Sequence, residues 1–368
     1  MYIANYNGEF LIKRMPNTGH EHSLQCDSFE PPAEISGLSD VVGTAIQEDP
    51  TTGEICLKLE FSLKKGPGKV QPAPSEKKPD SVKANDKKLT LLAALEFFWE
   101  EAQLNKWVPQ MSGKRNWNVI RRNILLAASK VKSKGKIIGE VLYIPEMFFL
   151  DRKIEISNRR LALLSKVSRQ QGATKQLLLL IGEVKGFSES PLGKRLIVKH
   201  APDYNFIVAD DLFIRLNKRY LTELSAIGID GIHVMVIATF SLNYKMVPTI
   251  EEMSLMLVSE EWLPFENEYE HNLVDLMVKS GRRFIKGLRY LQAFTKPMAS
   301  CLLTDLGTGP VALYIVPSDA DGDYLNALDE IIKDSSYQSW VWNVDQIQMP
   351  SLPENITEDA GKLGLFEK

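Results

Sequence analysis

The chain has 368 residues, of which 44% are hydrophobic and 25% charged, and its formal net charge is −3. These proportions are typical of folded globular proteins and exclude wholesale disorder. The longest purely aliphatic run, Leu177–Ile181, is far shorter than the ~20 residues that span a bilayer, and the N-terminus lacks a basic region followed by an apolar core. We therefore expect a cytoplasmic protein of two or three domains without a membrane-spanning segment.

Residues 1–64 are predicted to form a small β-rich domain. Asn7-Gly8 separates two short apolar segments, 2–6 and 9–13, and this dipeptide favours a two-residue hairpin turn. Residues 54–63 alternate between apolar and polar side chains, which predicts a strand with one buried face. A unit of this size buries little apolar surface alone, so we expect it to pack on another domain.

Three possible zinc ligands, His20, His22 and Cys26, lie in the sequence GHEHSLQCDSFEPP. A structural zinc site requires four ligands, and no second pair of cysteines or histidines is near. A polar loop is the alternative interpretation. The other cysteines, Cys56 and Cys301, are far away in the sequence, so the spacing predicts no disulfide framework.

Residues 65–88 are predicted to be a flexible linker, because prolines and lysines dominate the stretch and almost no apolar side chain is available for burial. A helical domain is predicted to follow at 89–170. Its first helix runs from 89 to about 107 and is stopped by Pro109. A second helix begins at Ser112 or Asn116, and the apolar stretch 137–149 is either the wing of a winged helix or a strand that leads into the next domain.

The most distinctive segment is 111–139, which contains many cations and no acidic residue: Lys114, Arg115, Arg121, Arg122, Lys130, Lys132, Lys134 and Lys136. If the helix begins at Ser112, four of these cations share one face, whereas a start at Asn116 leaves Lys114 and Arg115 in the preceding loop. Trp117 and the apolar residues that follow at helical spacing form the opposite stripe. The basic face suits a polyanion, and nucleic acid is the polyanion we predict; a solvated face without a partner is the alternative.

Residues 171–345 are predicted to form an α/β domain, followed by a loose acidic tail at 346–368. Apolar runs predict buried strands at 176–181, 195–198, 232–238 and 311–316. Periodicity and end signals predict helices at 210–226, 249–258, 270–280 and 324–333.

One tripeptide in this domain, Glu183-Val184-Lys185, matches the Glu-x-Lys element of nucleases that resemble restriction endonucleases. Residues i and i+2 of a strand point the same way, so a carboxylate that binds Mg²⁺ and an ammonium near the attacked phosphate can share one site. The required further aspartate has no convincing candidate. The alternative is that Glu183 and Lys185 are charged residues at the end of a strand, followed by a turn at Gly186.

The segment around Asp305 resembles nuclease hairpins that carry an aspartate on one strand and a glutamate on the next. Ser300 and Tyr314 occupy those two places here, so the resemblance implies an inactive relic, that is, a nuclease-like hairpin that has lost both acidic residues. A second basic and aromatic cluster at 282–290 either contacts phosphates and bases or consists of core aromatics and solvated charges. The sequence has no phosphate loop, dinucleotide turn, HExxH or GxSxG motif.

Three stretches together resemble an uncharacterised bacterial family, domain of unknown function eleven-seventy-three: FLIKRMPNTGHEHSLQCDSFEPP, GEVKGF with IVKHAPDYNFIVADDLF, and RRFIKGLRY with LLTDLGTGPVALYIVP. The resemblance covers most of the chain. It implies an association with plasmids and integrating mobile elements, but supplies no catalytic residues. Family members carry a Cys-x-Cys stretch ahead of this start, which would complete a zinc site with His20 or His22 and Cys26.

The sequence therefore predicts an α+β protein with a small N-terminal β unit, a helical middle for which a winged helix is one alternative, and a C-terminal α/β domain. The leading hypothesis is a non-catalytic accessory protein of a mobile element that binds nucleic acid, expected to be DNA, through Lys114, Arg115, Arg121 and Arg122. The alternatives are a Mg²⁺-dependent nuclease that uses Glu183 and Lys185, and a protein-interaction scaffold. No cofactor is expected apart from Mg²⁺ in the nuclease and Zn²⁺ at the N-terminus.

Overall fold

The computed structural model describes residues 2–6, 9–13, 18–24, 26, 28–49, 53–65, 87–168, 175–345 and 348–354. It confirms a mixed α+β fold, in which the described chain forms two compact units. Unit 1 comprises 1–40, 105–112 and 265–368, and unit 2 comprises 41–104 and 113–264. No helix in the described ranges is long and apolar enough to cross a membrane.

Unit 1 is built around a sheet of order β20-β19-β18-β17-β6. Its helices and strands are β1 (Tyr2–Tyr6), β2 (Glu9–Lys13), η1 (Gly19–Glu21), η2 (Ala33–Ile35), η3 (Gly37–Asp40), β6 (Lys106–Trp107), η4 (Pro109–Met111), α6 (Glu268–Lys279), β17 (Phe284–Lys286), β18 (Cys301–Leu303), β19 (Val311–Val316), α7 (Gly322–Asp334) and β20 (Gln338–Asn343). The predicted hairpin is confirmed by the antiparallel pairing of β1 with β2, although Asn7-Gly8 lies outside the described residues.

The core of unit 1 joins segments from both ends of the chain. Phe29 and Ile35 pack in one apolar cluster with Tyr314 and Leu328. Gly37 fits against the 288–289 backbone because a Cβ there would lie 2.0 Å from the Arg289 carbonyl oxygen. α7 connects β19 to its parallel neighbour β20, as a parallel pair requires a crossover.

Unit 2 contains a barrel and a smaller sheet of order β3-β4-β7-β8. Its elements are β3 (Ile46–Glu48), β4 (Ile55–Leu57), β5 (Lys64–Lys65), α1 (Leu91–Glu101), α2 (Trp117–Ala128), β7 (Val131–Ser133), β8 (Lys136–Ile137), η5 (Ile138–Glu140), β9 (Leu142–Tyr143), η6 (Leu150–Arg152), α3 (Lys153–Ser168), β10 (Lys175–Gln176), β11 (Leu178–Ser190), β12 (Gly193–Val198), β13 (Phe206–Val208), α4 (Asp210–Arg219), α5 (Leu221–Ser225), β14 (Ile232–Leu242) and β15 (Pro248–Ser259). The boundary to unit 1 falls within β16 (Pro264–Phe265).

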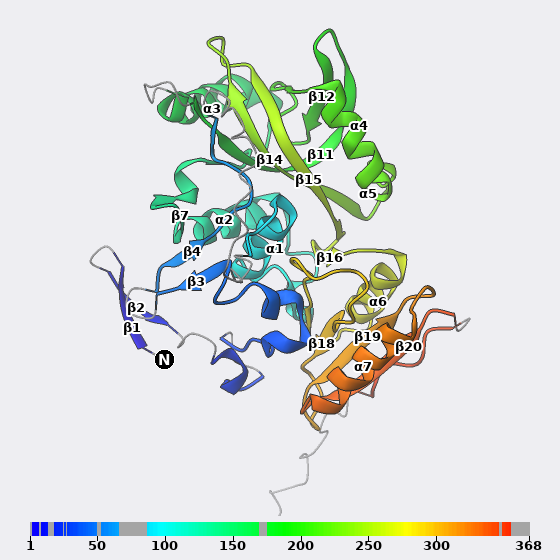
Figure 1. The fold of residues 1–368 in the computed structure, drawn as a ribbon. Helices are drawn as coiled ribbons and strands as arrows, with labels where there is room; N and C mark the ends of the chain where they lie inside the picture. Colours follow the sequence, from blue (N-terminus) through cyan, green and yellow to red (C-terminus); the bar gives the residue numbers. More distant parts are fainter. Residues whose placement is uncertain are drawn as a thin grey trace, which may run out of the picture. The chain divides into compact units, whose positions relative to one another are not determined.

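The barrel closes because β11 pairs with two different strands. Its first half pairs with β14 and its second half with β12, and the chain of pairs β12-β13-β15-β14 completes the circuit. A bulge at Lys185 separates the two halves, and Gly186 adopts a φ of 157° there. The predicted turn at Gly186 is therefore wrong, since the strand continues through it. α4 and α5 connect β13 to β14, and Figure 1 shows them beside β11, β12 and β15.

One predicted helix is wrong: residues 249–258 form most of strand β15. Its Glu, Met and Leu residues favour a helix, but β15 pairs with β14 along nearly its whole length, and this pairing overrides local propensity. The predicted helix 210–226 is interrupted at Tyr220, while α6 and α7 cover the other two predictions. The predicted strands at 195–198, 232–238 and 311–316 are confirmed.

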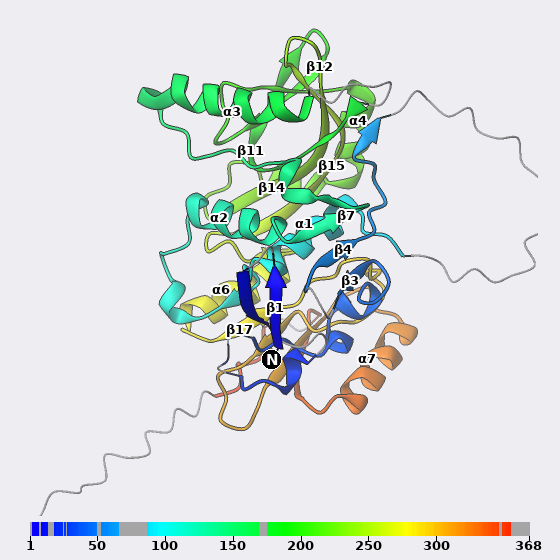
Figure 2. The same ribbon diagram turned by 90° about the vertical axis from the view of Figure 1, so that its left-hand side faces the viewer.

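The helical region begins as predicted, because the Thr90 side chain caps α1 by accepting from the backbone N–H of Ala93. α1 ends at Glu101 rather than near Trp107, since Gln103 adopts a φ of 55°, which a helix does not accommodate. α1 and α2 lie beside the long barrel strands, as both ribbon views show (Figures 1 and 2). β7 and β8 form a hairpin after α2, and β9 pairs with β11.

Strand pairing crosses the domain boundaries that the sequence predicts. β4, from the predicted N-terminal domain, pairs with β7 of the predicted helical domain. The predicted strand at 54–63 is regular only in β4, yet Ile55, Leu57, Leu59 and Phe61 are all buried, so the predicted apolar face is present. Most of the predicted linker (66–86) and of the predicted tail (346–347 and 355–368) lies outside the described residues.

Candidate nucleic-acid interface and buried charge clusters

The start of α2 is fixed by Asn116, whose side chain accepts hydrogen bonds from the backbone N–H groups of Asn118 and Val119. Of the two predicted starts, the structure therefore has the one at Asn116, and Lys114 and Arg115 precede the helix. Trp117 is buried and its indole N–H donates to the Pro145 carbonyl at 2.8 Å, so it anchors the helix as predicted.

Two of the four predicted phosphate-binding residues are engaged by the protein itself. Arg115 donates to the carbonyls of Leu104, at 2.9 Å, and Glu261, at 3.2 Å, and burial lowers the pKa of its guanidinium to about 10. Arg121 donates through Nε to the Ile144 carbonyl at 3.0 Å. These contacts hold α2 and the preceding loop in place.

The other two predicted residues, Lys114 and Arg122, are exposed. Their side chains form no ion pair or hydrogen bond with any part of the chain that the structure describes, and the same holds for Lys130 and Lys134. Lys132, by contrast, pairs with Glu54 at 2.5 Å. The segment thus combines cations used for folding with cations that face solvent.

The barrel carries a second exposed feature in the loop between β14 and β15. Tyr244 is 90% exposed, and the ammonium of Lys245 lies 5.5 Å from the centre of its ring. The loop itself is ordered by Asn243, whose side chain accepts from the backbone N–H groups of Lys245 and Val247. The hydrogen-bonded loop thus exposes the Tyr244 ring and the neighbouring Lys245 ammonium to solvent.

The predicted nuclease residue Glu183 lies in β11, and its buried carboxylate is the centre of a charge cluster that reaches the surface at Lys199. Its Oε1 accepts from Lys199 at 2.7 Å and contacts His233 Nδ1 at 2.8 Å, while His200 Nε2 lies 4.0 Å from Oε2. Burial raises the pKa of Glu183, but the hydrogen bonds and charges of His233 and Lys199 together outweigh this effect and leave the pKa below its ordinary value. Lys185 is exposed in the bulge, so the ammonium group beside Glu183 is that of Lys199.

Tryptophans stack on both histidines of this cluster. His200 stacks on Trp117 at 5.0 Å and His233 on Trp262 at 4.1 Å. Burial lowers the pKa of His200 to about 4, so its imidazole is neutral at pH 7. Sequence reasoning missed this cluster because its members are far apart in the chain and show no regular spacing. Only the pairing of β11 with β12 and β14 brings them together.

The predicted zinc ligands are partly assembled. The Cys26 thiol lies 3.6 Å from His22 Nδ1, whereas His20 is exposed. The described residues include no group of three or more His, Cys, Asp or Glu side chains that could hold a metal ion. The zinc hypothesis remains a prediction.

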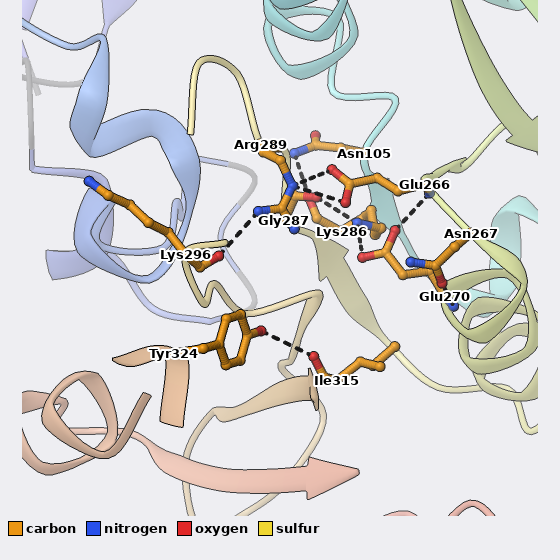
Figure 3. Close-up of polar contacts among 10 residues, drawn as sticks. All are labelled: Asn105, Glu266, Asn267, Glu270, Lys286, Gly287, Arg289, Lys296, Ile315 and Tyr324. Atoms are coloured by element: carbon orange, nitrogen blue, oxygen red, sulfur yellow. Dashed lines mark hydrogen bonds and ion pairs between the residues drawn. The ribbon is translucent and has the colours of Figure 1, made fainter. Parts of the chain in front are cut away.

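Unit 1 contains a network of two ion pairs, shown in Figure 3. Arg289 Nε donates to Glu266 at 2.8 Å, and the buried Lys286 ammonium donates to Glu270 Oε1 at 3.1 Å. Glu270 Oε2 also accepts from the backbone N–H of Glu266, which links the pairs. Burial lowers the pKa of Lys286, but the charges around it, of which Glu270 is the strongest, together outweigh this effect and leave the pKa above its ordinary value.

A cavity of about 280 Å³ lies over this network. Its lining comes from α6, the loop before β18, β19 and the start of α7, and comprises Glu266, Asn267, Tyr269, Glu270, Arg289, Phe294, Thr295, Met298, Ser300, Ile315, Pro317, Asp319, Ala320, Asp321 and Tyr324. Figure 3 shows the two ion pairs on one side of this region and Tyr324, whose hydroxyl contacts the Ile315 carbonyl, on the other.

The basic cluster at 282–290 belongs to the interior of unit 1. Arg282 forms a double hydrogen bond with the Asp305 carboxylate, at 2.8 Å for both Nε and Nη2. Tyr314, at the predicted relic position, packs in the core, while Ser300 lines the cavity. Of the two interpretations of this cluster, the structure favours core aromatics, but Arg282, Lys286 and Arg289 are paired with carboxylates rather than solvated.

The two units and their charge clusters define a mixed α+β protein with a closed barrel in one unit and a cavity in the other. The chain belongs to the family described as a protein of unknown function, DUF1173, whose family model matches residues 1–345. No curated protein and no solved structure matches the chain.

Proposed function

We propose that this protein binds single-stranded nucleic acid through unit 2, as an accessory protein without catalysis of its own. The observation that carries the proposal is the topology of the barrel. Five strands close in the order β11-β12-β13-β15-β14, β13 and β15 are parallel, and the helical segment lies between β13 and β14. This arrangement is that of the OB-fold, a barrel that binds oligonucleotides on the face of its second and third strands and on two adjoining loops.

The side chains in those places have the chemistry that single strands require. The loop between the last two barrel strands presents Tyr244 and Lys245, which can stack on a base and neutralise a phosphate. Arg195 of β12 lies opposite Ser188 of β11 and Ile207 of β13, and its side chain forms no ion pair with a described residue. It supplies a second cation to the same face.

The exposed cations around α2 supply further positive charge for binding phosphates. Trp117, at the start of α2, stacks on His200, which follows β12, so the basic helix is packed directly against the barrel. Lys114 and Arg122 are the predicted residues that remain free for phosphates. Arg115 and Arg121 support them by positioning the helix.

The sequence resemblance also suggests a setting. A protein that holds single strands fits the transfer or maintenance of a mobile element, where such strands arise, and DNA is the nucleic acid we propose. This setting rests on the resemblance, whereas the proposed binding rests on the barrel and its exposed side chains.

The proposed binding by the barrel is tested by fluorescence anisotropy with a labelled oligothymidine of about 20 nucleotides and its duplex form. Tyr244→Ala should weaken single-strand binding about tenfold, since one stacked base contributes ~1–3 kcal/mol. Tyr244→Phe keeps the ring and should bind like the wild type. Equal loss in both variants would show that the ring does not stack, and no binding at low salt would retire the proposal in favour of a protein partner.

The basic helix is tested by the salt dependence of the same binding. Lys114→Gln/Arg122→Gln should reduce the slope of log affinity against log salt by about 1.4, or ~0.7 for each lost contact to a single strand. Lys218→Gln/Lys333→Gln removes the same charge from exposed positions at the ends of α4 and α7 and should leave the slope unchanged. A similar reduction in both variants would indicate a general charge effect instead.

A further inference from the structure

We propose that the cavity of unit 1 is a binding site for a small organic cation, a molecule with a primary ammonium or guanidinium group. The site is independent of the proposed nucleic-acid surface, because all of its lining residues belong to unit 1 and none to the barrel.

The charges of the lining point to a cation. Within the network, Arg289 balances Glu266 and Lys286 balances Glu270, so these four residues add no net charge. Asp319 and Asp321 remain, and neither forms an ion pair with a described residue. The cavity thus carries two negative charges without an ion-pair partner at its exposed side, where an incoming ammonium group would meet them.

A second observation is the hydroxyl of Ser300. This side chain lines the cavity although the residue is only 6% exposed, and its hydroxyl has no hydrogen-bond partner within the described ranges. A hydroxyl that opens onto a cavity and has no partner of its own is available to form a hydrogen bond with the polar groups of a ligand.

An anionic ligand fits this cavity poorly. The start of α7 is the natural anion site there, but its end is already occupied by Asp321, whose side chain accepts from the backbone N–H of Tyr324 at 2.8 Å, and Asp323 follows in the first turn. Arg289 is held by Glu266 and by the carbonyls of Ala293 and Lys296.

Size and shape restrict the ligand further. A volume of about 280 Å³ is at the small end of ligand sites and suits a molecule such as a short diamine. Tyr269, Phe294 and Tyr324 line the cavity, and aromatic faces attract cations. Arg289 already lies 4.8 Å from the centre of the Phe294 ring, which shows that this ring accepts a cation.

The experiment is calorimetric titration of the full chain with putrescine and with agmatine, using 1,4-butanediol as the neutral control. Both cations should bind and butanediol should not. Asp319→Asn/Asp321→Asn should weaken binding at least tenfold, because two attractive charges are lost. Asparagine is also a good N-cap, so α7 remains capped in this variant.

The matched control is Asp329→Asn/Asp334→Asn, which removes two exposed charges of α7 outside the cavity and should bind like the wild type. Ser300→Ala, which keeps the charges and removes only the hydroxyl, should also weaken binding. Equal affinity in the cavity variant and the control, or binding of butanediol as tight as that of putrescine, would overturn the proposal. So would the absence of binding by either cation to the wild type.

Discussion

The two units use cations in opposite ways. In unit 1, Lys286 is 2% exposed and its charge is matched by the buried Glu270. Around α2 in unit 2, Lys114 and Arg122 face solvent and pair with no described residue. A buried pair fixes the fold, since each partner is costly to leave alone, whereas an exposed cation contributes little to stability and is available to a ligand. Charge alone therefore does not mark a functional residue; its partners do.

The largest effect that separates these roles is expected for Lys286→Met. The variant leaves Glu270 as an uncompensated buried charge, so the free energy of unfolding in urea should fall by about 3–5 kcal/mol. Lys286→Met/Glu270→Gln removes both charges and should recover much of this loss. A fall below ~1 kcal/mol in the single variant would mean that the pair is solvated, and the contrast between the units would disappear.

A smaller effect is expected from pH at the Glu183 cluster of unit 2. His200 has a folded pKa of about 4 against an ordinary value of 6.5, so between these values the unfolded chain binds a proton that the native protein does not. Stability therefore falls as pH decreases, by about 2 kcal/mol from pH 7 to 5 for this residue.

The check is a urea denaturation series at pH 7, 6 and 5 for the wild type and His200→Phe. Phenylalanine keeps a ring on Trp117 but does not titrate, so the variant should lose about 2 kcal/mol less than the wild type across the series. The same fall in both proteins would show that His200 is protonated in the folded state. Glu183 does not interfere, because its pKa is lowered and its contribution is lost only at more acidic pH.

The smallest effect is expected at Lys114, when the cations of the α2 region are compared with one another. Arg115→Met removes two hydrogen bonds from a charged donor to backbone carbonyls and should lower the free energy of unfolding by about 1.5–3 kcal/mol. Lys114→Gln, at the neighbouring exposed position, should change it by less than ~0.5 kcal/mol. The free energy of unfolding of both variants is measured by thermal and urea denaturation. An equal decrease in both would contradict the division into structural and free cations.

Local features were predictable from the sequence. The apolar stripe that begins at Trp117 is buried along α2, the dipeptide Asn7-Gly8 predicted the pairing of β1 with β2, and α6 and α7 lie close to their predicted positions. These elements depend on residues near one another in the chain. β15 was missed because its long pairing with β14 decided its conformation, and that pairing has no local signal.

The sites were harder to predict because they depend on register. Glu183 was identified for its spacing to Lys185, yet its partners Lys199 and His233 come from other strands. Ser300 was identified only as a missing aspartate, and its place in the cavity follows from the packing of α6 and α7 around the sheet. Sequence patterns indicated which residues to examine, but not which of them meet.

The most direct test of the account measures two affinities on two variants. Oligothymidine and putrescine are each titrated into Tyr244→Ala/Lys245→Gln, altered in the barrel loop, and into Asp319→Asn/Asp321→Asn, altered in the cavity. The account predicts that the first variant loses oligothymidine binding and keeps putrescine, and that the second does the reverse. A variant that loses both ligands while remaining folded, or one that loses neither, would contradict the claim that each unit carries its own site.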